Sequence, residues 1–386
     1  MNTRRSVTVG ACMLVLGIAA MDNAFAQSGG NSADQSDPLP AIDDVAISPD
    51  GQTMAYVLQH EGQPHLAIDD LSGGKVLVPP IENLEFRWLR WANNDRLVFA
   101  LQFPAKRGFA ETQETRLLGI DKDGANVVSI IKNATRVELG SHISVDVAPP
   151  QIQDDVIDWL PDDPDHILIS LDADHDDRNE VRRVDVNSGQ YDTVQVGLPG
   201  IQHHVADHND EVRFGWGLRR DNRVAWYKRS DGDWVNVSNA DWWLEGFMPV
   251  AFDDEADVAL LQGPGENGRL CIRRANLVTG ELLETVFKHD AADVDGIILE
   301  PNTRRAIGFR YTDKFQREQF SDEQMSALQR TIATALPDAA SQIASWSRNR
   351  RQLIVFVESV DDSGAFYLWD RDMKSFELLG KKISGS

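Results

Sequence analysis

Two short segments carry side chains that could bind a metal ion. In the segment DADHDDRNE, Asp172, Asp174 and Asp176 alternate along the chain and Glu180 follows. Carboxylate oxygens are the ligands that Ca²⁺ prefers, but Asp177 stands where a calcium loop needs glycine for its sharp turn. The alternative is a solvated acidic loop between two strands, and we adopt this interpretation.

The segment HHVADH forms the second set, with His204 and His208 four residues apart. On a helix these rings would converge as zinc ligands. The β-rich surroundings instead predict an extended strand, where His204, Ala206 and His208 share one face and successive members lie about 7 Å apart. A zinc ion would then need a ligand from another strand. We therefore expect these histidines to line or brace the centre of the fold.

The chain does not have the residue pattern of a serine-hydrolase nucleophile. No glycine is followed by serine at the second position and glycine at the fourth, the pattern that permits the strained turn of a nucleophile elbow. Cys271 has no His or Asp close by in the sequence, which predicts a buried, inert thiol. Trp242 and Trp243 suggest either a carbohydrate platform or core packing, the usual role of large aromatic residues. The sequence therefore predicts no catalytic residues, no metal ligands and no cofactor.

A repeated pattern predicts the elements that surround these residues. A short polar turn followed by a β-rich run recurs at seven anchors: Asp50, Asn94, Asp162, Asn209, Asp253, Asn302 and Arg348. Five of the six spacings lie between 44 and 49 residues, and the 68-residue spacing contains a polar insertion near 133–154. This period, with four alternating β-runs per repeat, is typical of propeller blades, which bury both faces of each sheet. The sequence predicts an all-β fold, a seven-bladed β-propeller of four-stranded blades over residues 40–380.

One repeat contains a helix. In SDEQMSALQRTIATALP, at 321–337, Ser321 and Gln324 have the spacing of a capping box. An apolar stripe follows at helical spacing, and Pro337 ends the pattern. The stripe consists of Met325, Leu328, Ile332 and Leu336. We expect this helical insertion in blade six to pack against the side of the propeller; the alternative is a docking element for a partner.

The two ends of the repeat array predict how the ring closes. The runs FYLWDRD and SFELLG read as the last two strands of blade seven, and AIDDVAIS at 41–48 as the first strand of blade one. Neither end has a spare strand. We therefore expect blades one and seven to close the ring by packing alone, with residues 381–386 as a tail.

The N-terminal residues read as an export signal. Arg4 and Arg5 precede an apolar run at 7–20, and Ala24-Phe25-Ala26 supplies small residues for cleavage before Gln27. We expect a signal peptide at 1–26, a disordered leader at 27–39 and a periplasmic or secreted protein, by the Sec or the twin-arginine route. The formal net charge of −23 disfavours binding to nucleic acid and to anionic membrane surfaces.

Parts of the chain resemble a known family. The run SPDGQTMAYV, the 321–337 segment and the ending SWSRNRRQLIVFVESVDDSGAFYLWDRDMKSFELL are similar to the N-terminal propeller of prolyl oligopeptidase-family serine peptidases, above all the exported acylaminoacyl- and dipeptidyl-peptidase-like members. In that family a following α/β-hydrolase domain carries the catalytic serine, aspartate and histidine. The propeller covers the active site and admits only short or flexible peptides.

No residue here matches the catalytic triad of that family. The resemblance therefore implies a non-catalytic, substrate-gating propeller without its hydrolase domain, with such a domain or peptides as partners. The first alternative is a stand-alone periplasmic binding or scaffold propeller. The second is a metal-dependent enzyme with its site in the central tunnel, formed by the acidic and histidine segments.

Overall fold

The computed structural model describes residues 40–80, 84–107, 109–132, 137–139, 143–145 and 149–383. The predicted signal peptide and leader lie outside the described residues. The polar insertion contains a two-stranded hairpin of β9 (Val137–Leu139) and β10 (Ile143–Val145). In the described part, no helix is both long and apolar enough to cross a bilayer.

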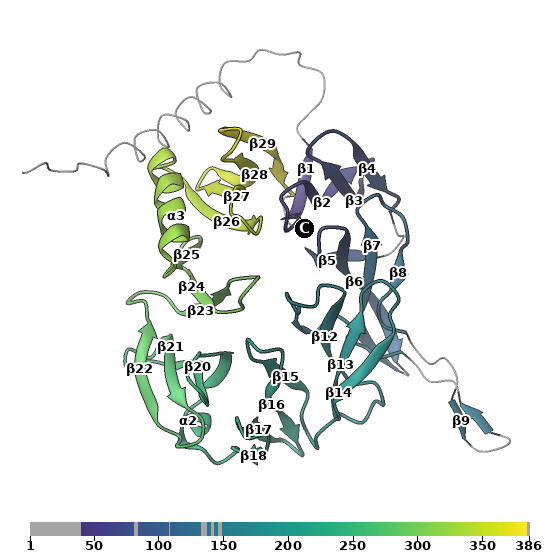
Figure 1. Ribbon diagram of the computed structural model, residues 1–386, viewed down its shortest axis with the longest axis vertical. Coiled ribbons are helices and arrows are strands. Elements are labelled where there is room, and N and C mark those ends of the chain that lie inside the picture. Colours follow the sequence, from purple (N-terminus) through teal and green to yellow (C-terminus); the bar gives the residue numbers. More distant parts are fainter. Residues whose placement is uncertain are drawn as a thin grey trace, which may run out of the picture.

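The chain folds into antiparallel sheets that stand side by side around a common centre (Figure 1). We number them in chain order. Sheet 1 contains β1 (Ala41–Ile47), β2 (Thr53–His60), β3 (Gln63–Asp70) and β4 (Lys75–Val78). Sheet 2 contains β5 (Glu85–Trp91), β6 (Arg96–Arg107), β7 (Ala110–Asp121) and β8 (Val128–Ser129). Sheet 3 contains β11 (Val156–Asp158), β12 (His166–Leu171), β13 (Glu180–Asp185) and β14 (Tyr191–Gln195).

The second half of the chain continues this pattern. Sheet 4 contains β15 (His203–Ala206), β16 (Val212–Arg219), β17 (Asn222–Lys228) and β18 (Trp234–Asn236). Sheet 5 contains β19 (Met248–Phe252), β20 (Val258–Pro264), β21 (Leu270–Asn276) and β22 (Leu282–Phe287). Sheet 6 contains β23 (Val294–Leu299), β24 (Ala306–Thr312) and β25 (Gln316–Phe320). Sheet 7 contains β26 (Ala340–Trp346), β27 (Gln352–Ser359), β28 (Asp362–Asp370) and β29 (Ser375–Lys382).

The core lies between neighbouring sheets. Strands in the middle of a sheet, such as β6 with its run LVFAL, are apolar at consecutive positions and buried there, because both faces of the sheet are covered. One apolar cluster joins sheets 1 and 2, another joins sheets 2 and 3, and others join sheets 4 and 5 and sheets 6 and 7. All seven predicted anchors lie between the first and second strands of their sheets.

The ring closes through backbone hydrogen bonds between its two ends. Strand β29 pairs in parallel with β1, with Ala41 opposite Lys381 and Ile42 opposite Lys382. The Lys381 N–H donates to the Pro40 carbonyl at 3.0 Å, and the Ile383 N–H donates to the Ile42 carbonyl at 3.0 Å. The prediction of closure by packing alone is therefore wrong. Strand β1 is the edge strand of sheet 1 and β29 is the edge strand of sheet 7, and they lie close enough to form a short parallel ladder.

Glycine permits this close approach at residue 380. A Cβ atom there would lie 2.5 Å from the Pro40 carbonyl oxygen, which is closer than any side chain tolerates. The contact between the chain ends thus depends on a residue without a side chain. Sheets 1 and 7 also share an apolar cluster that includes Ile42 and Phe356.

Helix α3 (Glu323–Ala335) follows β25 and lies beside β25 and β26 (Figure 1). Its N-cap is Asp322, whose carboxylate accepts a hydrogen bond from the Met325 N–H at 2.8 Å. The predicted cap at Ser321 is therefore wrong by one residue. Met325, Leu328 and Ile332 are buried in the cluster that joins sheets 6 and 7, as expected for packing on the side of the fold.

Candidate functional site

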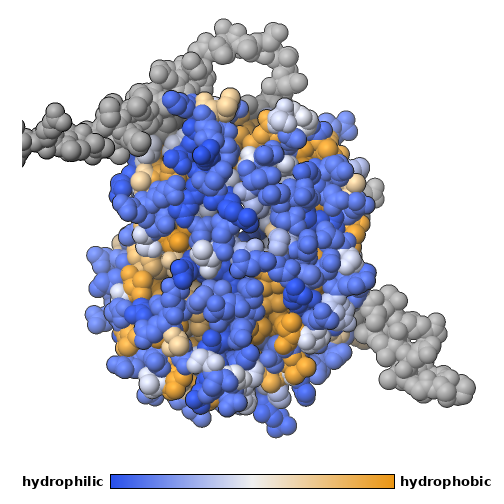
Figure 2. Space-filling model, in the orientation of Figure 1, coloured by the Kyte–Doolittle hydropathy of each residue, from blue (hydrophilic) through white to orange (hydrophobic). Residues whose placement is uncertain are grey.

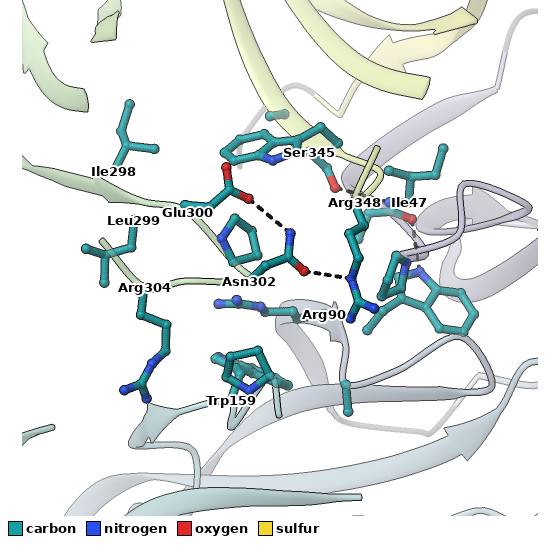
Figure 3. A pocket seen from close by; sticks show the side chains of 18 of the residues that line it. Ile47, Arg90, Trp159, Ile298, Leu299, Glu300, Asn302, Arg304, Ser345 and Arg348 are labelled. Carbon is teal, nitrogen blue, oxygen red and sulfur yellow. Dashed lines mark hydrogen bonds between the residues drawn. The ribbon is translucent and has the colours of Figure 1, made fainter. Parts of the chain in front are cut away.

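A cavity of about 450 Å³ lies at the centre of the ring (Figure 3). Its wall comes from β1, β5, β11, β23 and β26, the first strands of sheets 1, 2, 3, 6 and 7, and from the turns that follow them. Arg310 of β24 also lines it. This volume lies within the range of small-molecule sites. Figure 2 shows mainly hydrophilic residues around the middle of this face.

The cavity wall carries more arginines than acids. The arginines are Arg90, Arg304, Arg310 and Arg348, and the acids are Asp44, Asp158 and Glu300. Two of the acids form ion pairs, Glu300 with Arg350 and Asp158 with Arg304. The wall is therefore locally basic in a chain whose formal net charge is −23.

The third acid, Asp44, is engaged by the backbone. Its carboxylate accepts a hydrogen bond from the Leu89 N–H at 2.7 Å and so links β1 to β5. Burial raises the pKa of Asp44 to about 6, against the opposing effect of this hydrogen bond. A carboxyl group with this pKa is still mostly ionised at neutral pH, so Asp44 contributes one negative charge to the cavity wall.

Arg90 contacts the cavity wall through an aromatic ring only. Its guanidinium carbon lies 4.5 Å from the centroid of the Trp159 ring (Figure 3). The guanidinium group forms no hydrogen bond or ion pair with another described residue. Trp159 is held edge to face by Trp88 at a centroid distance of 5.9 Å. Desolvation by neighbouring protein atoms lowers the pKa of Arg90 to about 10. The side chain still reaches solvent within the cavity, so it stays charged at neutral pH.

Arg348 has an amide partner in place of an acid. Its Nε–H donates to the Asn302 side-chain oxygen at 2.7 Å, and the Asn302 amide donates to Glu300 at 3.2 Å (Figure 3). The Arg348 backbone N–H donates to the Pro49 carbonyl at 2.7 Å. Sheets 6, 7 and 1 are thus joined at the cavity rim by one arginine.

Arg304 crosses the centre of the ring. It extends from the turn after β23 in sheet 6 and forms an ion pair with Asp158, which ends β11 in sheet 3. It also lies 3.3 Å from the Asp210 carboxylate and donates to the Asp207 carbonyl, both in the turn between β15 and β16 of sheet 4. Sheet 3 lies across the ring from sheet 6 (Figure 1). The side chain therefore acts as a bar across the cavity.

The predicted anchor turns contact one another around this face. Sheets 1 and 2 are linked by the Asp50 N–H and Asn94, and sheets 2 and 3 by Asn93 and the Pro164 carbonyl. Sheets 4, 5 and 6 are linked through Asp254, which lies 3.8 Å from His208 and 2.9 Å from Arg305. These contacts give the repeated polar turns a structural role that the sequence pattern did not reveal.

The two histidines do not form one site. His204 on β15 is 5% exposed, and its Nδ1 lies 3.1 Å from the Ser170 hydroxyl on β12. The ladder shifts register after Val205 and β15 ends at Ala206, so His208 lies in the following turn. The prediction that these histidines share a strand face is therefore wrong. His204 braces sheet 3 against sheet 4 and does not line the cavity.

His204 should make stability depend on pH. Burial lowers its pKa from 6.5 to about 4, so the unfolded chain takes up the proton first as the pH falls through this window. We expect the wild type to lose up to about 3 kcal/mol of unfolding free energy relative to His204→Asn between pH 7 and 4. Urea unfolding at several pH values measures this difference. A constant difference would show that His204 titrates normally.

Ser170 brings a carboxylate and a histidine together without forming a catalytic triad. Its hydroxyl contacts the Asp155 carboxylate and His204 Nδ1, so the serine lies between the acid and the base. A triad needs the histidine in the middle, oriented by the acid toward the serine. Ser170 is also 1% exposed, which keeps a substrate away from it.

The acidic segment forms the connection between β12 and β13, as predicted. The Asp176 N–H donates to the Asp172 carboxylate at 3.0 Å within this loop. Within the described residues, no group of three or more His, Cys, Asp or Glu side chains is placed to hold a metal ion.

The paired tryptophans lie inside the protein. Trp242 and Trp243 belong to the short helix α2 (Asp241–Leu244), are 0% and 2% exposed, and pack against Phe214 and Phe247. The carbohydrate-platform interpretation is wrong, because no ring face is open to a sugar. Cys271 is buried in the same cluster, and burial raises its pKa, as expected of an inert thiol.

Comparison with known proteins decides the fold. No protein-family model and no curated protein matches the chain. Among solved structures, the β-propeller domain of the Trilobed protease from Pyrococcus furiosus matches with a TM-score of 0.47 and 10% identity, over 90% of this chain and 97% of that one. A prolyl endopeptidase studied for inter-domain dynamics matches with a TM-score of 0.50 and 12% identity, over 95% of this chain and 52% of that one. The chain is a β-propeller.

A further prolyl peptidase shows the same relation. Prolyl oligopeptidase B from Galerina marginata matches the propeller with a TM-score of 0.50 and 11% identity, over 95% of this chain and 55% of that one. The propeller thus spans about half the length of these two peptidases. The similarity to propellers of prolyl oligopeptidase-type proteins is confirmed at the level of the fold.

Proposed function

We propose that residues 40–380 are a seven-bladed propeller that serves as the non-catalytic, substrate-gating part of an exported prolyl oligopeptidase-like serine peptidase. Sheets 1–7 would be the blades, with α3 in place of the fourth strand of blade six. The observation that carries the proposal is the central cavity, which the Arg304 side chain crosses. The propeller that contains it is similar to about half of a prolyl endopeptidase.

The cavity supports gating by size. Its volume of about 450 Å³ suits a small ligand or a few residues of extended peptide. A folded protein domain is too large for such an opening, and Arg304 narrows it further from side to side. A hydrolase active site beneath the propeller would therefore be reached by short or flexible peptides.

The absence of a nucleophile elbow from these 386 residues supports the non-catalytic part of the proposal. The Asp155–Ser170–His204 contact has the wrong order for a triad and is closed to substrate. Export is supported by the arginine pair, the apolar run and the Ala24-Phe25-Ala26 motif near the N-terminus.

A stand-alone binding propeller is the second candidate function. The unpaired Arg90 on the cavity wall favours it, because a cation without a counter-ion suits an anionic ligand. The DNA immediately downstream helps to separate the two functions. A hydrolase-coding frame supports gating, whereas an unrelated intact gene supports a binding propeller.

The gating function predicts that the propeller forms a complex with the hydrolase domain encoded by such a downstream frame. We expect the mixture to cleave a tripeptide substrate and to leave a folded protein substrate intact, whereas the hydrolase domain alone cleaves both substrates. Size-exclusion chromatography and peptide release measure complex formation and size selectivity. Absence of a complex, or equal cleavage with and without the propeller, would favour the stand-alone function.

A further inference from the structure

The central cavity of the propeller contains a positive charge that no ion pair with a described residue neutralises. Of the four cavity arginines, Arg304 pairs with Asp158, and Arg310 lies 3.4 Å from Glu318. Arg90 has no acid within the described residues and rests on Trp159. A guanidinium held in a protein cavity loses part of its hydration, which a bound anion restores with short, charge-assisted hydrogen bonds.

A second arginine adds positive charge without a counter-ion. Arg348 uses its Nε–H for Asn302 and has no ion pair with a described residue. The nearest acid in this chain of contacts, Glu300, is already neutralised by Arg350. The guanidinium nitrogens of Arg90 and Arg348 therefore remain as donors on the cavity wall (Figure 3).

The wall also carries apolar and aromatic side chains among its polar ones. Ile47, Ile157, Ile298 and Trp346 line the cavity beside Trp159. The Trp346 Nε1–H is buried and has no acceptor within the described part of the chain. A site that combines apolar side chains with a few convergent donors suits a small organic anion better than a bare ion.

We propose that the central cavity binds the carboxylate of a small organic acid the size of a short peptide, such as a peptide C-terminus. Arg90 is the main counter-charge, with Trp159 fixing its plane, and Arg348 adds a second donor group. A planar carboxylate matches the fork of a guanidinium, which a neutral amide cannot do. The isolated chain should bind this ligand whether or not a hydrolase domain joins it, so this proposal stands or fails separately from gating.

Isothermal titration calorimetry on the purified chain tests the site with two matched probes. These are N-acetyl-trialanine with a free C-terminal carboxylate and the same peptide as its C-terminal amide. We expect the acid to bind at least about tenfold more tightly than the amide, since a hydrogen bond to a charged group contributes enough for that ratio. Equal affinity of the two probes, or no binding of either, would overturn the proposal.

Arg90→Met identifies the residue responsible, because it keeps the length of the side chain and removes its charge. We expect this variant to bind the acid about tenfold more weakly and the amide as before. Arg219→Met is the matched control, because Arg219 is an exposed arginine at the end of β16 and outside the cavity. Unchanged acid binding in Arg90→Met, or an equal loss in Arg219→Met, would contradict the assignment to Arg90.

Discussion

Replacement of Arg304 by methionine should destabilise the protein by about 3–5 kcal/mol, the cost of leaving one member of a buried ion pair without its partner. The Asp158 side chain is 1% exposed and that of Arg304 11% exposed, so the substitution leaves a buried charge without its counter-ion. Arg304 also links sheet 6 to two residues of sheet 4. Urea unfolding followed by tryptophan fluorescence measures the loss.

Two further variants separate the ion pair from a general effect of substitution. Arg305→Met removes the neighbouring arginine, which is 60% exposed and paired with the exposed Asp254, and it should change stability by less than about 1 kcal/mol. Asp158→Asn combined with Arg304→Met removes both charges and should be less destabilised than Arg304→Met alone. Equal losses in Arg304→Met and Arg305→Met would contradict the role of Arg304 as a bar across the ring.

Truncation of Met325 in helix α3 should also cost stability, by about 2–5 kcal/mol. Met325 is fully buried in the cluster that joins sheets 6 and 7, and alanine would leave a cavity there. Met373→Ala is the control, because Met373 is 77% exposed and its loss should change stability by at most about 0.5 kcal/mol. Similar urea midpoints for the two variants would show that the apolar stripe of α3 is not packed on the propeller.

The positions of the strands and of α3 were predictable because their signals are local. Polar turns such as the one at Asp50 interrupt runs with a period of two, and Met325, Leu328 and Ile332 repeat at helical spacing. The one-residue error at the helix start reflects two neighbouring residues, Ser321 and Asp322, that can both cap a helix.

The contacts that build the centre were not predictable, because they join residues far apart in the sequence. Arg90 meets Trp159, and Arg304 meets Asp158, only after the sheets have formed a ring. For the pairing of β1 with β29, the sequence signal is Gly380, where the close approach of Pro40 excludes a side chain. A register shift within β15 places His208 in the turn after the strand. No residue type near the shift is a sequence signal for such a bulge.

Labelling with a fluorophosphonate probe tests the central proposal, that this propeller serves as the non-catalytic part of a serine peptidase. The probe reacts with serines activated by a base and an oxyanion hole, and intact-mass spectrometry reports each adduct. We predict no adduct on the purified chain, because its sequence has no nucleophile elbow and the Ser170 hydroxyl is buried between Asp155 and His204. Stoichiometric labelling of any serine in the isolated chain would contradict the account.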